Sequence, residues 1–392
     1  MGVYEDLGLR PIINLHPFGT RLGGPMMDQE VLDAMMAASQ QSVPMDQRQA
    51  TASRIIADVT GAEAGYVTAG AASSLTLATA ACIAGLDVKL MDLLPNTSGI
   101  PNEVIIAREQ RSGYDHAIRA AGARLVEVGM NEILAGAGVR TTKAWGYEAA
   151  ISQNTVAIAY FYRLRVTPTL EKVINIGNKY KIPVIVDAAA QLPPVENLRK
   201  FISMGADLVT FSGGKAICGP QSTGILCGQS DLISSVALQH LDLDERYETW
   251  NPPQSLIPRD RLLGIPRHGI GRGFKVTKEE IVALLTALRR FTSNLCIQRA
   301  ERCSFLLQLI AKEIQNIPNT NIELKNPDNN EEAPVLRIKL NEKNLGLSAF
   351  EVSHRLINGD PSVYVDEALL HEGKTRIKCS SGGQLGRGSS RL

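Results

Sequence analysis

The chain has 392 residues, above the size at which a single hydrophobic core usually stops growing, so two domains are expected. Lys plus Arg (41) nearly cancels Asp plus Glu (40), and the net charge of +1 argues against a nucleic-acid partner, although a local basic patch stays open. Abundant glycine with only 5% aromatic residues favours an α/β protein over a β-sandwich.

The six cysteines are scattered without a C-x-x-C pair, which is typical of free thiols in a reducing compartment. The N-terminus shows no basic region followed by an apolar run, so we expect no signal peptide and a cytoplasmic location. Residues 66–86 carry no charge, but their Ala, Gly, Ser and Thr content predicts a buried strand, turn and helix rather than a membrane span.

Short β-branched or apolar runs alternate with helical patterns along the first 230 residues. Strands are expected at Gly65–Thr68, Val104–Ala107, Leu125–Val128, Val156–Phe161, Val184–Asp187, Leu208–Phe211 and Gly224–Cys227. Helices are expected at Ala72–Ala84, Tyr114–Ala121, Leu170–Tyr180 and Asn197–Met204. This alternation predicts an α/β fold with a mostly parallel sheet covered on both faces.

The segment Asp244–Gly273 is rich in Pro, Gly and Arg and predicts a long functional loop or an exchange with a partner subunit. The elements expected beyond it are helices Lys278–Ser293 and Ile297–Ile314, strand Val335–Leu340, helix Ser348–Ile357 and strand Ser362–Val365. We therefore expect an N-terminal segment and large domain at 1–290, a small α/β C-terminal domain at 291–378, and a disordered Ser/Gly-rich tail at 379–392.

Two charged residues follow predicted strands, at the sheet edge where open parallel sheets bind ligands. Asp187 ends the apolar run in PVIVDAAAQLPP. A desolvated carboxylate needs a partner, and a protonated pyridine nitrogen would serve, while capping of the next helix is the alternative. Lys215 follows a Ser-Gly-Gly turn, where partial burial would lower its pKa and let the amine form an imine with an aldehyde. A surface lysine after a glycine turn is the alternative.

A third segment, Thr68–Ser73, follows the strand AGYVT and opens an apolar helix. Small residues there expose backbone N–H groups to an anion such as phosphate, while a tight βα turn is the alternative. Phosphate-binding turn, then carboxylate, then lysine is the chain order of fold-type-I pyridoxal-phosphate (PLP) enzymes. The six histidines show no H-x-x-x-H or H-E-x-x-H spacing, so no metal is expected.

Longer stretches carry a closer resemblance: INLHPFGTRLGG, GAEAGYVTAGAASSLTLA, PVIVDAAAQLPP, GADLVTFSGGKAICGPQSTGILCG and HGIGRGFKVTKEEIVALL. They resemble the selenocysteine synthase-like family, and more closely its short members of the D-glucosaminate-6-phosphate ammonia-lyase type. The resemblance implies a fold-type-I PLP-dependent transferase fold with pyridoxal 5'-phosphate as cofactor. It also implies that Lys215 forms the Schiff base and that Asp187 holds the pyridinium.

The resemblance also suggests roles for further residues. It implies that the cofactor phosphate is held by Gly70, Ala71, Ala72 and Ser212, and reached by Arg272 from this or a neighbouring subunit. His116 or Tyr114 is implied beside the cofactor ring, although His116 could equally be a helix-face histidine. Candidates for substrate contacts are Arg163, Arg165 and Gln191, of which the arginines suit a carboxylate or phosphate or could be surface charges.

These features together predict a PLP-dependent lyase that acts on an amino acid or amino-sugar acid. Lys215 would remove the Cα proton, a β-hydroxyl would leave, and ammonia would be released. The residues leave open a selenium or sulfur transferase, an aminotransferase, a racemase, an aldolase, or a non-catalytic PLP-binding protein. The resembling pattern starts almost at residue 10, without the extra N-terminal tRNA-binding region of selenocysteine synthase, so tRNA is not the expected substrate. A homodimer or higher homo-oligomer is expected.

Overall fold

The computed structural model describes residues 2–130, 142–163, 166–293, 295–325 and 333–379. Contacts within the chain separate a small unit (Met1–Gln29, Pro193–Val195 and Arg289–Leu392) from a large unit (Glu30–Leu192 and Glu196–Leu288). The expected boundary at 290/291 lies beside Arg289. The N-terminal residues, expected with the large domain, belong instead to the small unit. The expected tail at 379–392 lies outside the described residues except for Cys379.

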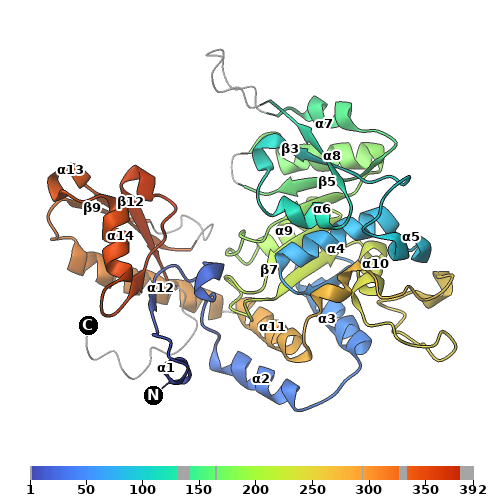
Figure 1. The fold of residues 1–392 in the computed structure, drawn as a ribbon, viewed down its shortest axis with the longest axis horizontal. Coiled ribbons are helices and arrows are strands. Elements are labelled where there is room, and N and C mark those ends of the chain that lie inside the picture. The colour runs from blue at the N-terminus through green and yellow to red at the C-terminus, as the bar shows by residue number, and fades with distance from the viewer. Residues whose placement is uncertain (1, 131–141, 164–165, 294, 326–332, 380–392) are drawn as a thin grey trace. The chain divides into compact units, whose positions relative to one another are not determined.

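A seven-stranded sheet forms the centre of the large unit (Figure 1). Its strands are β2 (Ala64–Thr68), β3 (Glu103–Ala107), β4 (Arg124–Val128), β5 (Thr155–Phe161), β6 (Val184–Asp187), β7 (Leu208–Ser212) and β8 (Gly224–Gly228). Their order is β2-β8-β7-β6-β5-β3-β4. Only β8 runs antiparallel to its neighbours. The structure thus confirms the predicted, mostly parallel sheet.

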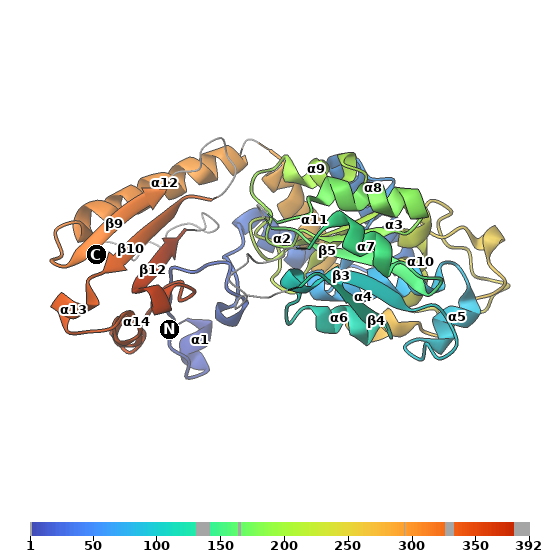
Figure 2. The ribbon, with the colours of Figure 1, turned by 90° about the horizontal axis from the view of Figure 1, so that it is seen from above.

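Helices cover both faces of this sheet, as Figure 2 shows. One face carries α3 (Met45–Thr60), α7 (Ala144–Ala150), α8 (Leu170–Tyr180) and α9 (Asn197–Ser203). The other carries α4 (Ala71–Ala84), α5 (Val88–Leu93), α6 (Asp115–Ala120) and α10 (Ser230–His240). The helix α4 has no polar face and is almost wholly buried against five strands, β2, β5, β6, β7 and β8, which keeps its N-terminus fixed at the sheet edge.

The helix α8 shows how the sequence sets a local element. Leu170, Val173, Ile174 and Gly177 follow the spacing of one helical face, and all are buried. A side chain at Gly177 would meet the Ile182 carbonyl oxygen at 2.7 Å, so glycine lets the helix approach the strand that follows. The helix then positions β6, which ends at the candidate carboxylate.

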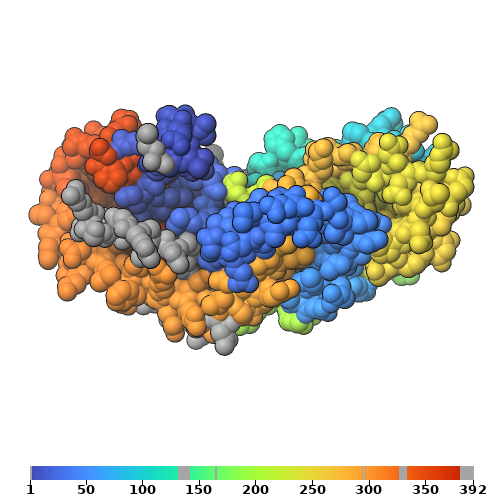
Figure 3. Space-filling model, turned by 90° about the horizontal axis from the view of Figure 1, so that it is seen from below, coloured from blue at the N-terminus to red at the C-terminus, as the bar shows by residue number. Residues whose placement is uncertain are grey.

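The long irregular segment Asp244–Gly273 is confirmed, because it contains only the short turns η3 (Arg259–Arg261) and η4 (Ile270–Phe274). It is nevertheless anchored, since Trp250 and Ile257 are buried in the core of the large unit. Figure 3 shows α2 (Gln29–Ser39) on the surface beside α11 (Lys278–Phe291). A hydrogen bond links these two helices, because Lys278 Nζ donates to the Ser39 carbonyl at 2.7 Å.

The small unit has a three-stranded antiparallel sheet of order β12-β10-β9. Its elements are α12 (Leu295–Ile314), β9 (Thr320–Lys325), β10 (Val335–Leu340), α13 (Glu342–Leu345), α14 (Ala349–Ile357), β11 (Val363–Tyr364), η6 (Leu370–Glu372) and β12 (Lys374–Lys378). The N-terminal part of the chain adds α1 (Val3–Asp6), β1 (Ile13–Asn14) and η1 (Thr20–Leu22). Because β1 pairs in parallel with β11, the N-terminal residues are part of this unit. Among the described residues, every helix is too short or too polar to cross a membrane.

Candidate functional site

The sheet register brings the three predicted segments to one edge. On one side of β7, Ser212 pairs with Gly224, which pairs in turn with Thr68 at the end of β2. On the other side, Thr210 of β7 pairs with Asp187 of β6. The turn before α4, the carboxylate and the loop that carries Lys215 therefore leave the same edge of the sheet, at the ends of β2, β6 and β7. Sequence alone could not predict this strand order, because β8, which follows β7 in the chain, inserts between β2 and β7 in the sheet.

Asp187 ends β6 with its backbone held on both sides. Its carbonyl accepts from Tyr162 N–H at 3.0 Å, and the next residue, Ala188, donates to the Thr210 carbonyl at 3.0 Å. Its Oδ1 accepts from Ala189 N–H at 2.9 Å. Burial raises the pKa of the Asp187 carboxyl above its ordinary value, although that hydrogen bond and the positive charge of Lys215 oppose the rise. The site thus holds a desolvated carboxylate that a cationic partner would stabilise.

Lys215 lies in a tightly closed loop between β7 and β8. Gly213 N–H donates to the Thr223 carbonyl at 2.9 Å, and the Lys215 carbonyl accepts from Cys218 N–H at 2.9 Å. A side chain at Gly214 would meet the Gln221 backbone at 2.4 Å, so only glycine fits this turn. Burial lowers the pKa of the Lys215 amine, and the charge of Asp187 only partly opposes the shift. The shift makes the neutral, nucleophilic form of this amine easier to reach than in a solvent-exposed lysine.

In the turn before α4, the backbone of Gly70 and Ala71 lies close to the backbone of Gly224. Gly70 adopts φ +90°, and a side chain at Gly224 would meet the Gly70 carbonyl carbon at 2.5 Å and Ala71 N at 2.7 Å. Ser73 Oγ donates to the Gly70 carbonyl at 2.9 Å. The first backbone N–H groups of an α-helix have no partner within the helix and point outward at its N-terminus. Those of Ala71 and Ala72 therefore suit an anion.

The predicted ring neighbours follow β3 at the same edge. Thr76 of α4 donates to the Ala117 carbonyl at 2.9 Å, which holds α6 beside α4. His116, on the first turn of α6, is exposed, and its Nδ1 lies 2.9 Å from the Arg119 guanidinium. Tyr114 is 61% exposed. Both side chains are thus accessible on the described chain.

The remaining predicted residues have distinct surroundings. Arg272 forms an ion pair with Asp242 at 2.6 Å. Gln191 Nε2 donates to the Tyr162 carbonyl at 3.1 Å and so links the loops that follow β5 and β6. Arg163 is exposed, and its positive charge partly opposes the rise that burial causes in the pKa of the Asp187 carboxyl, which places Arg163 near the candidate carboxylate. Arg165 lies outside the described residues.

Two polar residues that sequence reasoning missed lie at this end of the sheet. Thr210 is fully buried, is in register with Asp187, and has a hydroxyl without a hydrogen-bond partner. Gln110, after β3, accepts from Phe161 N–H at 3.0 Å through Oε1, while its buried Nε2 has no partner. Such unpaired buried groups are rare in proteins. The only sequence signal for Thr210 and Gln110 as site residues is a polar side chain near the end of an apolar strand.

These features fit PLP. A desolvated carboxylate matches a cationic ring nitrogen, a lysine with lowered pKa matches an aldehyde, and a glycine-lined helix N-terminus matches a phosphate. In the described ranges, no group of three His, Cys, Asp or Glu side chains is arranged to hold a metal ion.

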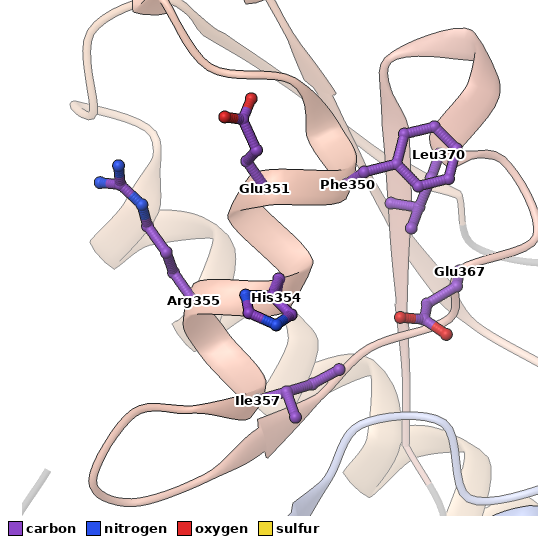
Figure 4. A pocket seen from close by; sticks show the side chains of 7 residues that line it. All are labelled: Phe350, Glu351, His354, Arg355, Ile357, Glu367 and Leu370. Atoms are coloured by element: carbon purple, nitrogen blue, oxygen red, sulfur yellow. The ribbon is translucent and has the colours of Figure 1, made fainter.

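A cavity of about 580 Å³ lies in the small unit, and none of the predicted site residues lines it (Figure 4). Its lining consists of Phe350, Glu351, His354, Arg355, Ile357, Glu367 and Leu370. Glu367 already accepts from Ser353 Oγ at 2.8 Å and pairs with Arg21 at 2.5 Å. We therefore assign the candidate active site to the sheet edge of the large unit.

Known structures share this architecture. D-glucosaminate-6-phosphate ammonia-lyase is similar with a TM-score of 0.77 and 27% identity, over 96% of this chain and 93% of that one. The apo cysteine desulfurase of Thermococcus onnurineus NA1 has the same fold, with a TM-score of 0.54 at 17% identity over 95% and 91% of the two chains. Fold and site together define the class of fold-type-I PLP enzymes.

Residues 12–246 match the family model described as L-seryl-tRNA selenium transferase, and the chain belongs to this family. The 5'-C-glycyluridine monooxygenase-decarboxylase of a Streptomyces species is 28% identical over 384 residues, covering 95% of this chain and 86% of the relative. The D-glucosaminate-6-phosphate ammonia lyase of Salmonella typhimurium is 28% identical over 379 residues, covering 95% and 91%. The predicted family, fold class and cofactor are thereby confirmed.

Proposed function

We propose that the protein is a PLP-dependent lyase that eliminates a β-hydroxyl from an amino acid or amino-sugar acid and releases ammonia. The observation that carries this proposal is the placement of Lys215 and Asp187 at one sheet edge, where each charge influences the pKa of the other and burial shifts the two pKa values in opposite directions. Similarity to an ammonia lyase along nearly the whole chain supports elimination as the reaction.

Each residue of the site has a role in this proposal. Lys215 Nζ would hold the cofactor and serve as the base toward the Cα proton of the substrate, since burial lowers the pKa of this amine and so favours its unprotonated form. The Asp187 carboxylate holds the ring nitrogen in its protonated form. The N–H groups of Ala71 and Ala72 hold the phosphate. When bound, PLP supplies an electron sink for the charge left on Cα.

The roles of the surrounding residues follow from their positions. Gln191 keeps the loops after β5 and β6 together through Tyr162. The Arg163 side chain, exposed near Asp187, recognises an acid group of the substrate, because a guanidinium matches a carboxylate or phosphate in two hydrogen bonds. His116 or Tyr114 covers the ring from the start of α6, where both side chains are exposed.

The second candidate function is an oxygen-dependent decarboxylation of a glycyl nucleoside. The observation that favours it is the equal identity, 28%, of the monooxygenase-decarboxylase relative over 95% of this chain. Selenium transfer to seryl-tRNA is the third candidate, and the family description supports it. The balanced charge of the chain offers no overall attraction for RNA.

The test is a set of three assays on purified protein loaded with PLP. Ammonia and 2-keto acid release from D-glucosaminate 6-phosphate is the expected result, together with loss of both products in Lys215→Ala. Oxygen uptake with 5'-C-glycyluridine, without ammonia release from the sugar acid, would favour the second candidate instead. A salt-sensitive gel shift with seryl-tRNA would favour the third.

We also propose that the protein functions as a homodimer. In the large unit, α2 and the segment after it expose Leu32, Met36 and Val43 on the surface. Apolar side chains gathered on one surface segment are typical of a protein–protein contact. Light scattering of the holoenzyme at several concentrations tests this proposal, and a monomer mass throughout would contradict it.

A further inference from the structure

Thr210 and Asp187 are neighbours on one face of the central sheet. They are register partners on β7 and β6, and so are Leu208 and Ile185, two residues earlier on each strand. Both of these apolar residues belong to the core cluster that includes residues of α4. Because side chains alternate between the two faces of a strand, the side chains of Thr210 and Asp187 share the face that α4 covers.

The Thr210 hydroxyl is buried without a hydrogen-bond partner among the described residues. Its register partner on the other side, Leu226 of β8, is apolar and fully buried. The next polar residue of this face along β7 is Ser212, about 6.6 Å further on, whereas neighbouring strands lie only about 4.8 Å apart. Asp187 is thus the nearest polar side chain on this face of the sheet to which the hydroxyl could donate.

The Asp187 carboxylate, in turn, has few donors. Ala189 N–H donates to Oδ1 at 2.9 Å, and this is the one hydrogen bond to the carboxylate that the described residues provide. An ionised carboxylate has about four acceptor sites. Burial raises the pKa of Asp187, although the charges of Lys215 and Arg163 oppose the rise. A bound cationic ring would favour the ionised form, and the buried carboxylate would then gain from a further donor.

We propose that Thr210 is a positioning residue for Asp187: when the cofactor ring is bound, the Thr210 hydroxyl donates to the carboxylate and holds it toward the ring nitrogen. Rotation about the Cα–Cβ bond of Thr210 exchanges the positions of the hydroxyl and the methyl group, so the strands need not move. The backbone at this point is already fixed, since Ala188 N–H donates to the Thr210 carbonyl at 3.0 Å. The inference rests on the proposed role of Asp187 as partner of the PLP ring nitrogen.

The Thr210 hydroxyl should therefore have opposite effects in the two states of the protein. Without cofactor, a buried hydroxyl that lacks a partner lowers stability, because folding removes its hydrogen bonds to water. With cofactor, its hydrogen bond to an ionised carboxylate stabilises the complex. A hydroxyl with a purely structural role would instead stabilise both states.

Thr210→Val tests this inference, because it replaces the hydroxyl with a methyl group of similar size. In the full-length protein freed of cofactor, the variant is expected to melt at the wild-type temperature or above it. Titration with PLP, followed by absorbance, should show binding about tenfold weaker than in wild type. The analogue 1-deaza-pyridoxal phosphate has carbon in place of the ring nitrogen and cannot pair with the carboxylate, so both proteins should bind it equally.

Two further variants make the result specific. Thr210→Ser keeps the hydroxyl and should retain the wild-type affinity for PLP. Thr79→Val removes another fully buried hydroxyl, which donates to the Leu75 carbonyl at 2.8 Å, and should leave the preference for PLP over the deaza analogue unchanged.

Two results would contradict the inference while leaving the proposed function intact. In one, Thr210→Val binds PLP as tightly as wild type does. In the other, the variant loses affinity for PLP and for the deaza analogue to the same extent. A wild-type protein that shows no preference for PLP over the analogue would overturn the proposed role of Asp187, and this inference with it.

Discussion

Burial shifts the pKa values of Lys215 and Asp187 in opposite directions, because it disfavours the charged form of each group. The amine becomes a better nucleophile, and the carboxylate becomes a group that gains from a cationic partner. Each charge moderates the shift of the other. The resting site is therefore prepared for a ligand that carries an aldehyde and a protonated ring.

For Lys215→Arg we expect loss of the covalently held cofactor and a fall in kcat of at least about 10²–10⁴-fold, because arginine neither forms an imine nor accepts a proton at neutral pH. The measurement is the mass of the tryptic peptides after borohydride reduction, together with kcat. Lys172→Arg, on the exposed face of α8, is the matched control and should keep both properties. A pyridoxyl mass on another lysine of the wild-type protein would contradict the assignment.

For Asp187→Asn we expect higher stability without cofactor but lower activity. Because burial raises the pKa of Asp187, the ionised carboxylate is the less favourable form in the folded protein. Its contribution to stability is present below the unfolded pKa and is lost as pH rises through the folded pKa. At neutral pH the variant should thus melt about 2–4 °C higher, the shift typical of about 1 kcal/mol.

The measurement for this variant is the melting temperature of cofactor-free protein at several pH values from mild acid to neutral pH, because a raised pKa moves the titration of the Asp187 carboxyl toward neutral pH. The difference between variant and wild type should shrink as pH falls. A variant that is less stable at all pH values would show that the carboxylate has a structural role.

At the scale of elements, the turn before α4 and the start of β8 form one packed unit. For Gly224→Ala we expect about 1–3 kcal/mol of destabilisation, because the new Cβ would lie 2.5 Å from the Gly70 carbonyl carbon and 2.7 Å from Ala71 N. The N–H groups of Ala71 and Ala72, which we propose hold the phosphate, would move, so PLP affinity should fall about tenfold, which corresponds to about 1.4 kcal/mol.

The measurement is a PLP titration followed by absorbance, with urea unfolding for stability. Gly146→Ala on α7 is the matched control, since nothing lies within 4 Å of its added Cβ. Equal PLP affinity in Gly224→Ala and wild type would show that this turn does not hold the phosphate.

At the scale of the whole molecule, the N-terminal segment and the C-terminal strand meet in one ion cluster of the small unit. The Asp366 side chain is 3% exposed and pairs with Arg376 at 2.8 Å, Lys378 at 3.1 Å and His16 at 3.5 Å. Burial opposes ionisation of Asp366, but its hydrogen bonds and these charges prevail and lower its pKa. Burial also lowers the pKa of His16, which favours its neutral form.

For Asp366→Asn we expect a loss of about 1–3 kcal/mol in the stability of the small unit, because the variant leaves two partly buried cations, Arg376 and Lys378, without their counter-charge. The wild-type contribution is present above the unfolded pKa of Asp366 and is lost as pH falls through the lowered folded value. Urea unfolding at pH 7 and in mild acid measures both effects. Asp360→Asn is the control, because that residue also pairs with an arginine but its side chain is 93% exposed. A cost no larger than that of the control would contradict the prediction.

The sequence by itself determined the elements with strong local patterns. All seven strands of the large sheet were predicted within two residues of their observed bounds, and Leu170–Tyr180 and Val335–Leu340 match as predicted. The strand-end positions of Asp187 and Lys215 follow from apolar runs that stop at a turn. The amphipathic or weakly patterned helices α2 and α3 and the strands β9 and β12 were missed.

Only the tertiary structure decided which strand ends are neighbours, because pairing joins segments far apart in the chain. Thr210 shows this, since its position beside Asp187 depends on the register of β6 and β7. The assignment of the N-terminal residues to the small unit depends likewise on the pairing of β1 with β11. Local propensity acts over a few residues, whereas burial and ion pairs such as that of Asp366 with Arg376 and Lys378 arise only when distant segments pack together.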